Sequence, residues 1–71
     1  GGLVVAVQKL MVAANWTMSA LAKKSHVSLS HLSKFLRLKS LLSYYLVKRL
    51  ARAFGVTLGT LDDMAEEFAK N

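Results

Sequence analysis

Four polar side chains in the segment 29–37 recur at intervals of three and four residues, which places them along one side of a helix. They are Ser30, Ser33, Lys34 and Arg37. Leu32 and Phe35 fall on the opposite side. Lysine and arginine can donate hydrogen bonds to guanine O6 and N7, and serine hydroxyls can donate to a phosphate or a base edge. This is how a chain presents a helix to the major groove of DNA, so the neighbouring elements must hold that helix in place.

Catalytic and metal-binding chemistry has little support in the chain. His26 and His31 lie five residues apart, with no cysteine and no nearby acid to complete a zinc site. The carboxylates lie far along the chain from both histidines, so no Ser-His-Asp arrangement is visible. No glycine-rich phosphate loop occurs. We therefore expect no enzymatic activity, no metal ion and no cofactor.

Charge is segregated along the sequence. The net charge is +6, all four acids lie in the last ten residues, and nine of the ten Lys and Arg residues precede them. A merely soluble surface normally mixes both signs, whereas cations without acid neighbours repel one another and favour a polyanion. The alternatives are a generic basic protein and a membrane-surface helix. The second is weaker because the cations are spread over several segments.

Length and composition predict a single domain over residues 1–71. A hydrophobic fraction of 54% allows a packed core and argues against disorder. The absence of cysteine excludes a disulfide framework and fits a reducing compartment. The longest apolar stretch, 3–14, contains Gln8 and Lys9 and is too short to span a bilayer. Gly1 and Gly2 are interpreted as a cloning remnant or a frayed start.

Apolar residues recur with helical spacing in five segments, and no alternation typical of strands occurs. We therefore expect an all-α domain of five short helices, over 3–14, 18–25, 29–36, 44–54 and 58–70. The predicted N-caps are Thr17, Ser28, Ser43 and Thr57. The residues expected to end helices in the left-handed conformation are Asn15, His26 and Gly55.

Core positions follow from the same periodicity. In the second and third helices and the turn between them, the residues expected inside are Leu21, Ala22, Val27, Leu32 and Phe35. In the fourth helix they are Tyr44, Val47, Leu50, Ala51 and Phe54, and in the fifth Leu58, Leu61, Ala65 and Phe68. The leucine-rich segment 38–42 is expected to connect the third and fourth helices.

The chain resembles the Cro/CI-type helix-turn-helix (lambda repressor-like, XRE) family over roughly residues 7–61. The resemblance rests on Leu21-Ala22 before the turn, Val27-Ser28 after it, Leu32 and Phe35, and the run LARAFGVTL at 50–58. The most diagnostic spacing joins Ala22, the turn residue four positions later and Leu32. The resemblance implies a lambda repressor-like fold of five short helices, with the helix-turn-helix at about 17–37.

The chain departs from the family pattern at several positions. Met18 stands where the family usually has a glutamine that contacts phosphate, and His26 where it has a glycine. Met11 and Leu36 occupy the places of an arginine and a glutamate that usually pair. Because both members of that pair are apolar here, the exchange is matched, and such exchanges are often neutral or stabilising.

The resemblance also implies a set of DNA contacts. The base-reading positions would be Leu29, Ser30, Ser33, Lys34 and Arg37. The phosphate contacts would be Lys9, Thr17, Met18, Lys23, Lys24, Ser28 and Lys39. Met18 would contribute the backbone N–H of a helix N-terminus. Leu29 would rest on a thymine methyl or, alternatively, extend the core beside Leu32.

We therefore expect sequence-specific binding of double-stranded DNA by a Cro/CI-type transcriptional repressor, with helix 29–36 in the major groove and a dimer on a two-fold operator. The alternative is an idealised, engineered or diverged version of the fold with weak or no specific DNA binding. It would act as a structural or protein-interaction module. A homodimer would use the C-terminal helix and the region 38–42. Neither a membrane nor a small-molecule partner is expected. The resemblance implies a cytoplasmic location in a bacterium or a phage host.

Overall fold

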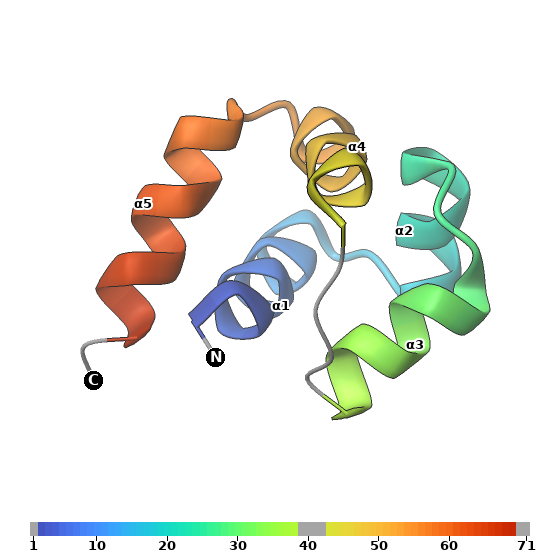
Figure 1. Cartoon of the computed structure of the whole chain (residues 1–71). Helices are drawn as coiled ribbons and strands as arrows, with labels where there is room; N and C mark the ends of the chain where they lie inside the picture. The colour runs from blue at the N-terminus through green and yellow to red at the C-terminus, as the bar shows by residue number, and fades with distance from the viewer. Residues whose placement is uncertain (1, 39–42, 70–71) are drawn as a thin grey trace.

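The computed structural model describes residues 2–38 and 43–69. Within these ranges the chain forms five helices and no strand: α1 (Gly2–Ala14), α2 (Met18–Ser25), α3 (Leu29–Leu38), α4 (Tyr44–Phe54) and α5 (Leu58–Ala69). In Figure 1, α5 lies on one side of α1 and the α2–α3 pair on the other, with α4 above α1. The predicted all-α, lambda repressor-like class is confirmed.

Side-chain caps begin four of the helices at the predicted residues. Each predicted N-cap side chain accepts a hydrogen bond from the backbone N–H three residues later, at 3.0 to 3.3 Å; the caps are Thr17, Ser28, Ser43 and Thr57. These bonds satisfy one of the N–H groups that the first turn of a helix leaves without a partner. The starts of α2 to α5 are therefore encoded by single residues.

Three residues adopt the left-handed conformation at the ends of helices, as predicted. Asn15 and His26 have a φ of 58°, and Gly55 has a φ of 72°. The backbone N–H of Val27 donates to the carbonyl of Ala22 at 3.2 Å, which closes the turn after α2. An L residue is strained in this region, and histidine tolerates it better than most.

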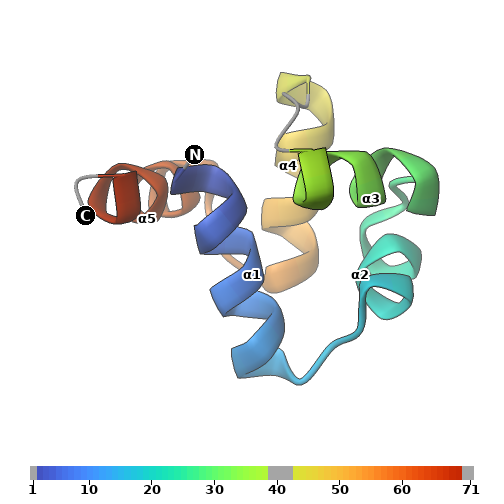
Figure 2. The ribbon, with the colours of Figure 1, turned by 90° about the horizontal axis from the view of Figure 1, so that it is seen from below.

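The core has two parts that share α1. The first joins α1, α2, α3 and α4, and its fully buried members are Val7, Leu21, Leu32 and Leu50. The second joins α1, α4 and α5 through Ala6, Ala51 and Leu61. The helix-turn-helix therefore sits on one side of α1 and the C-terminal helix on the other, as Figure 2 shows from below.

Three expectations from the sequence need correction. Tyr44 was expected inside but is 67% exposed, because the first turn of α4 projects beyond the other helices in Figure 2. The third helix runs two residues past its predicted end and includes Leu38, since no glycine or proline stops it there. The rest of the expected connector, residues 39–42, lies outside the described residues.

Gly2 is the third correction, because it belongs to α1 rather than to a frayed start. A Cβ atom added there would overlap the carbonyl oxygen of Ala65 in α5. The N-terminal turn of α1 therefore lies against the α5 backbone at a distance that only glycine allows.

No single helix among the described residues is long and apolar enough to cross a membrane. Taken together, α1 and α2 satisfy the length and composition of a span, but they are bent by 100° relative to each other.

Candidate nucleic-acid interface

The α2–α3 unit is locked by a small set of buried residues. Val27, in the turn, is only 3% exposed, and Leu32 of α3 is completely buried. Ala22, on the facing side of α2, is buried too, and its short side chain allows the two helices to approach closely. The orientation of α3 is therefore fixed by packing, and its outer face is presented to solvent as a rigid surface.

The predicted base-reading residues share the outer face of α3. Ser30, Lys34 and Arg37 are exposed, and Ser33 is half-buried. Leu29 is 48% exposed, which places it at the rim of the core instead of within it. The structure therefore brings the predicted base readers together on one surface.

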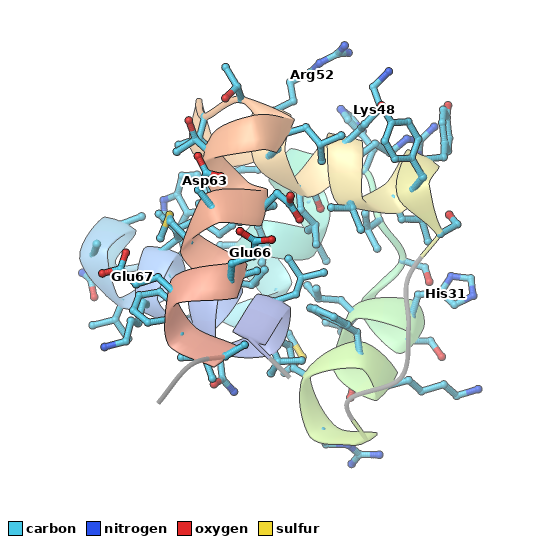
Figure 3. The ribbon with its side chains drawn as sticks, turned by 60° about the vertical axis from the view of Figure 1, so that its left-hand side comes forward. His31, Lys48, Arg52, Asp63, Glu66 and Glu67 are labelled. Carbon is cyan, nitrogen blue, oxygen red and sulfur yellow. The ribbon has the colours of Figure 1, made fainter. Side chains whose placement is uncertain are left out.

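His31 belongs to the same surface. From the sequence it was weighed only as a possible metal ligand. It is exposed, and Figure 3 shows its ring projecting from the first turn of α3. Its position beside Ser30 and three residues before Lys34 could have marked it as a surface residue. No group of three or more metal-ligating side chains occurs among the described residues, so His31 has no ligand set around it there.

The predicted phosphate-contacting residues at the helix starts also have roles in the fold. Met18 is half-buried and packs against the first core cluster, so its side chain serves the fold. Its backbone N–H remains at the N-terminus of α2, where an anion is favoured. The hydroxyl oxygens of Thr17 and Ser28 accept cap hydrogen bonds, and each hydroxyl hydrogen can still be donated.

The predicted lysine contacts are divided between different faces. Lys23 is exposed on α2. The Nζ atom of Lys24 lies 5.1 Å from the centroid of the Trp16 ring. The Nζ atom of Lys9 lies 5.0 Å from the centroid of the Phe68 ring in α5, and α5 and α3 lie on opposite sides of α1 in Figures 1 and 2. Lys9 is therefore not brought together with α3. Lys39 lies outside the described residues.

Met11 and Leu36 are both part of the apolar interior between α1 and α3. Leu36 is buried in the first core cluster, and Met11 packs against that cluster. Both line the same shallow apolar pocket. The two positions at which the resemblance would place an ion pair are thus filled by apolar side chains, as expected.

Arg49 of α4 contacts the turn between α2 and α3, a role that was not predicted from the sequence. Its Nη1 atom donates a hydrogen bond to the backbone carbonyl of His26 at 2.8 Å, and its Nη2 atom donates to Tyr45 Oη at 2.6 Å. The guanidinium carbon also lies 4.4 Å from the centroid of the Tyr45 ring. The spacing of four between Tyr45 and Arg49 indicates a pair on α4, but nothing local points to His26.

A rigid helix-turn-helix with a polar, exposed second helix defines a class of DNA-binding domain. A helix-turn-helix family model matches residues 7–61, which is more than half of the 71-residue chain. The chain belongs to this Cro/CI-like helix-turn-helix family, whose members are typically DNA-binding regulators of transcription. No significant match was found among curated proteins or among solved structures.

Proposed function

We propose that the chain binds double-stranded DNA in a sequence-specific manner and represses transcription, with α3 lying in the major groove. The observation that carries the proposal is that one side of α3 is buried in the core and the other side is exposed to solvent. Leu32 and Phe35 are at most 2% exposed, whereas Ser30, Lys34 and Arg37 face solvent. No acid precedes residue 62, so none on α2 or α3 opposes the approach of phosphates.

Base recognition is assigned to the outer face of α3. Lys34 and Arg37 are proposed to bind guanine O6 and N7, which are acceptors in the major groove. Ser30 and His31 can donate to a base edge or to the adjacent phosphate. Leu29, being nearly half exposed, is placed to contact a thymine methyl.

Phosphate contacts are assigned to the elements that flank α3. The N-termini of α2 and α3 present backbone N–H groups, and Lys23 adds a charge on α2. These groups carry no sequence information, but they would hold α3 in register on the duplex. Because Met18 cannot donate through its side chain, the backbone N–H has a larger share of this contact than in relatives with glutamine.

Dimerisation on a two-fold operator is proposed to use the face shared by α4 and α5. An apolar groove of about 470 Å³ opens there, lined in part by Leu3, Tyr44, Val47, Leu58, Leu61 and Ala65. Tyr44 is 67% exposed in the single chain and would become buried in such a contact. A second copy of the chain is the proposed occupant, because half-sites one helical turn apart require a paired protein.

The test is a selection from duplexes with a randomised site, followed by titration of the selected duplex and a scrambled duplex across a salt series. The proposal predicts an enriched palindromic site and a steep decrease of log K with log salt for both duplexes. A steep salt dependence without any enriched site would contradict sequence-specific repression. Absence of binding at low salt would contradict DNA binding altogether.

A further inference from the structure

A second cationic surface lies outside the proposed DNA-reading face. A groove of about 400 Å³ runs between the end of α2 and one side of α4, and we call it the α2–α4 groove. The residues that matter for its chemistry are Lys24, His26, Tyr45, Lys48, Arg49 and Arg52. Four of these carry a positive charge, and no acid lines the groove. Such a groove is suited to an anionic ligand.

The cations of the groove follow from the helical phase of α4. Tyr45, Lys48, Arg49 and Arg52 are spaced by three, one and three residues, so they share one stripe of the helix. Leu50 and Ala51 on the other side are buried. Like charges three and four residues apart destabilise a helix, so this stripe is electrostatically unfavourable while the groove is empty. A polyanion would relieve that repulsion.

Aromatic rings and hydrogen bonds hold three of the four cations in place. Arg49 is fixed by its bonds to His26 and Tyr45. The Nζ atom of Lys48 lies 5.6 Å from the centroid of the Tyr44 ring, and Lys24 lies over Trp16. Because these side chains are already ordered, less conformational entropy is lost when an anion binds. Arginine also offers five N–H donors, of which Arg49 uses two, so donors remain for phosphate oxygens.

The α2–α4 groove and the outer face of α3 point in different directions. Figure 3 shows Lys48 and Arg52 projecting from α4 at the top of the view, while α3 lies at the bottom and His31 projects sideways from it. DNA is stiff over about 150 base pairs, so a short duplex lying along α3 does not bend toward Lys48 and Arg52, which project in another direction. An anion in the groove would belong to a separate molecule or to a distant segment.

We propose that the α2–α4 groove binds the phosphate backbone of a second nucleic-acid segment, so that the protein bridges two duplexes. The bridging part rests on the proposed function of α3, whereas anion binding by the groove does not. Nucleic acid is favoured over the acidic α5 of another copy. Duplex DNA carries about one negative charge per 1.7 Å of its axis, a higher density than the four acids of the 12-residue helix α5 provide.

The experiment uses two duplexes of about 20 base pairs, each shorter than the bending length of DNA, one carrying a donor dye and the other an acceptor dye. Energy transfer on addition of protein reports bridging, and anisotropy with one labelled duplex reports single-duplex binding. The test variant is Lys48→Ala with Arg52→Ala. The matched control is Lys48→Arg with Arg52→Lys, which keeps both charges. Melting curves and sedimentation test whether all three proteins are folded and have the same oligomeric state.

The wild type and the charge-preserving control are expected to bridge at similar concentrations. The double alanine variant is expected to need at least a tenfold higher concentration. Its site preference should be unchanged, and the salt slope of the bridging step should be lower by about 2. Equal bridging by the alanine variant would overturn the inference. The inference would also be overturned if the double alanine variant self-associated less than the wild type, because the loss of bridging would then be explained by the loss of dimers.

Two further arms separate this inference from the proposed function. Lys34→Ala with Arg37→Ala should remove site preference while the groove still binds a duplex in a salt-dependent way. If that variant loses site preference and the Lys48 and Arg52 variant bridges normally, the proposed function stands and the groove inference fails. A glutamate-rich peptide that binds the groove more tightly than a duplex would also overturn it, in favour of an acidic protein partner.

Discussion

The Nη1 atom of Arg49 on α4 donates a hydrogen bond to the backbone carbonyl of His26, 23 residues earlier in the chain, at 2.8 Å. His26 is the left-handed residue at which α2 ends. The fourth helix therefore holds the turn of the helix-turn-helix from outside the α2–α3 unit. We therefore expect the stability of the turn, and with it the position of α3, to depend on this contact between distant segments.

Replacing Arg49 with alanine should lower the free energy of unfolding by about 1 kcal/mol, the net value of a typical hydrogen bond. For a domain of this size that corresponds to a decrease of the melting temperature by about 4–8 °C. Arg52→Ala is the matched control, because it removes the same charge one turn later on the exposed side of α4. Thermal unfolding at equal salt measures both. Because Arg52 belongs to a stripe of like charges, its removal should leave stability unchanged or raise it, and equal losses for the two variants would contradict a specific role for the bond to His26.

His26→Gly should stabilise the domain. The residue has a φ of 58°, which costs a non-glycine residue about 1–2 kcal/mol, while the greater freedom of glycine in the unfolded chain takes back about 0.5–1 kcal/mol. The imidazole is exposed and makes no hydrogen bond with the described part of the chain, and the carbonyl that accepts from Arg49 is kept. A net gain of about 0.5–1 kcal/mol in chemical denaturation is expected.

The comparison for this prediction is Asn15→Gly, at the same φ of 58°. Asparagine enters the left-handed region at lower cost than most residues, so its replacement should change stability less. A loss of stability on His26→Gly would mean that the imidazole has a role in the fold.

Helix starts and ends could be predicted from the sequence because the interactions that make them are local. A cap such as Thr17 bonds to a backbone group three residues away, and Gly55 ends α4 through its own dihedral angles. The errors have a different cause. Gly2 lies against Ala65, and the exposure of Tyr44 depends on how far α4 extends past the other helices, so both are tertiary facts.

The candidate site was predictable to the extent that it lies on one helix. The outer face of α3 follows from periodicity alone, and the structure places Ser30, Lys34 and Arg37 there. Periodicity within one helix could not predict which surface of the domain the cations of the other helices share. Lys9 lies over Phe68 on the α5 side, whereas Lys24 joins α4 in a groove, and both had been grouped as phosphate contacts. Only the relative positions of the helices distinguish them.

Substitutions on α3 and α2 should separate base reading from phosphate binding. Lys34→Ala and Arg37→Ala are each expected to cost about 1–3 kcal/mol on the selected operator and to relax preference at one base position. Lys23→Ala should weaken all duplexes to a similar degree and lower the salt slope by about 1. Competition titrations with selected and scrambled duplexes measure both effects. If the three variants behave alike, α3 does not read bases.

The two described helical glycines should respond in opposite directions to alanine. A Cβ on Gly2 would overlap the carbonyl oxygen of Ala65, which is backbone and cannot rotate away, so α1 and α5 must separate. At Gly59 the nearest atom to an added Cβ is Thr57 Oγ1 at 3.9 Å, an ordinary contact. Gly59→Ala should therefore stabilise α5 by about 0.5 kcal/mol through helix propensity. Gly2→Ala gains the same propensity but should destabilise by about 1–3 kcal/mol, as overpacking does. Urea unfolding of both variants tests the pair, and a stabilised Gly2→Ala would mean that α1 does not lie against α5.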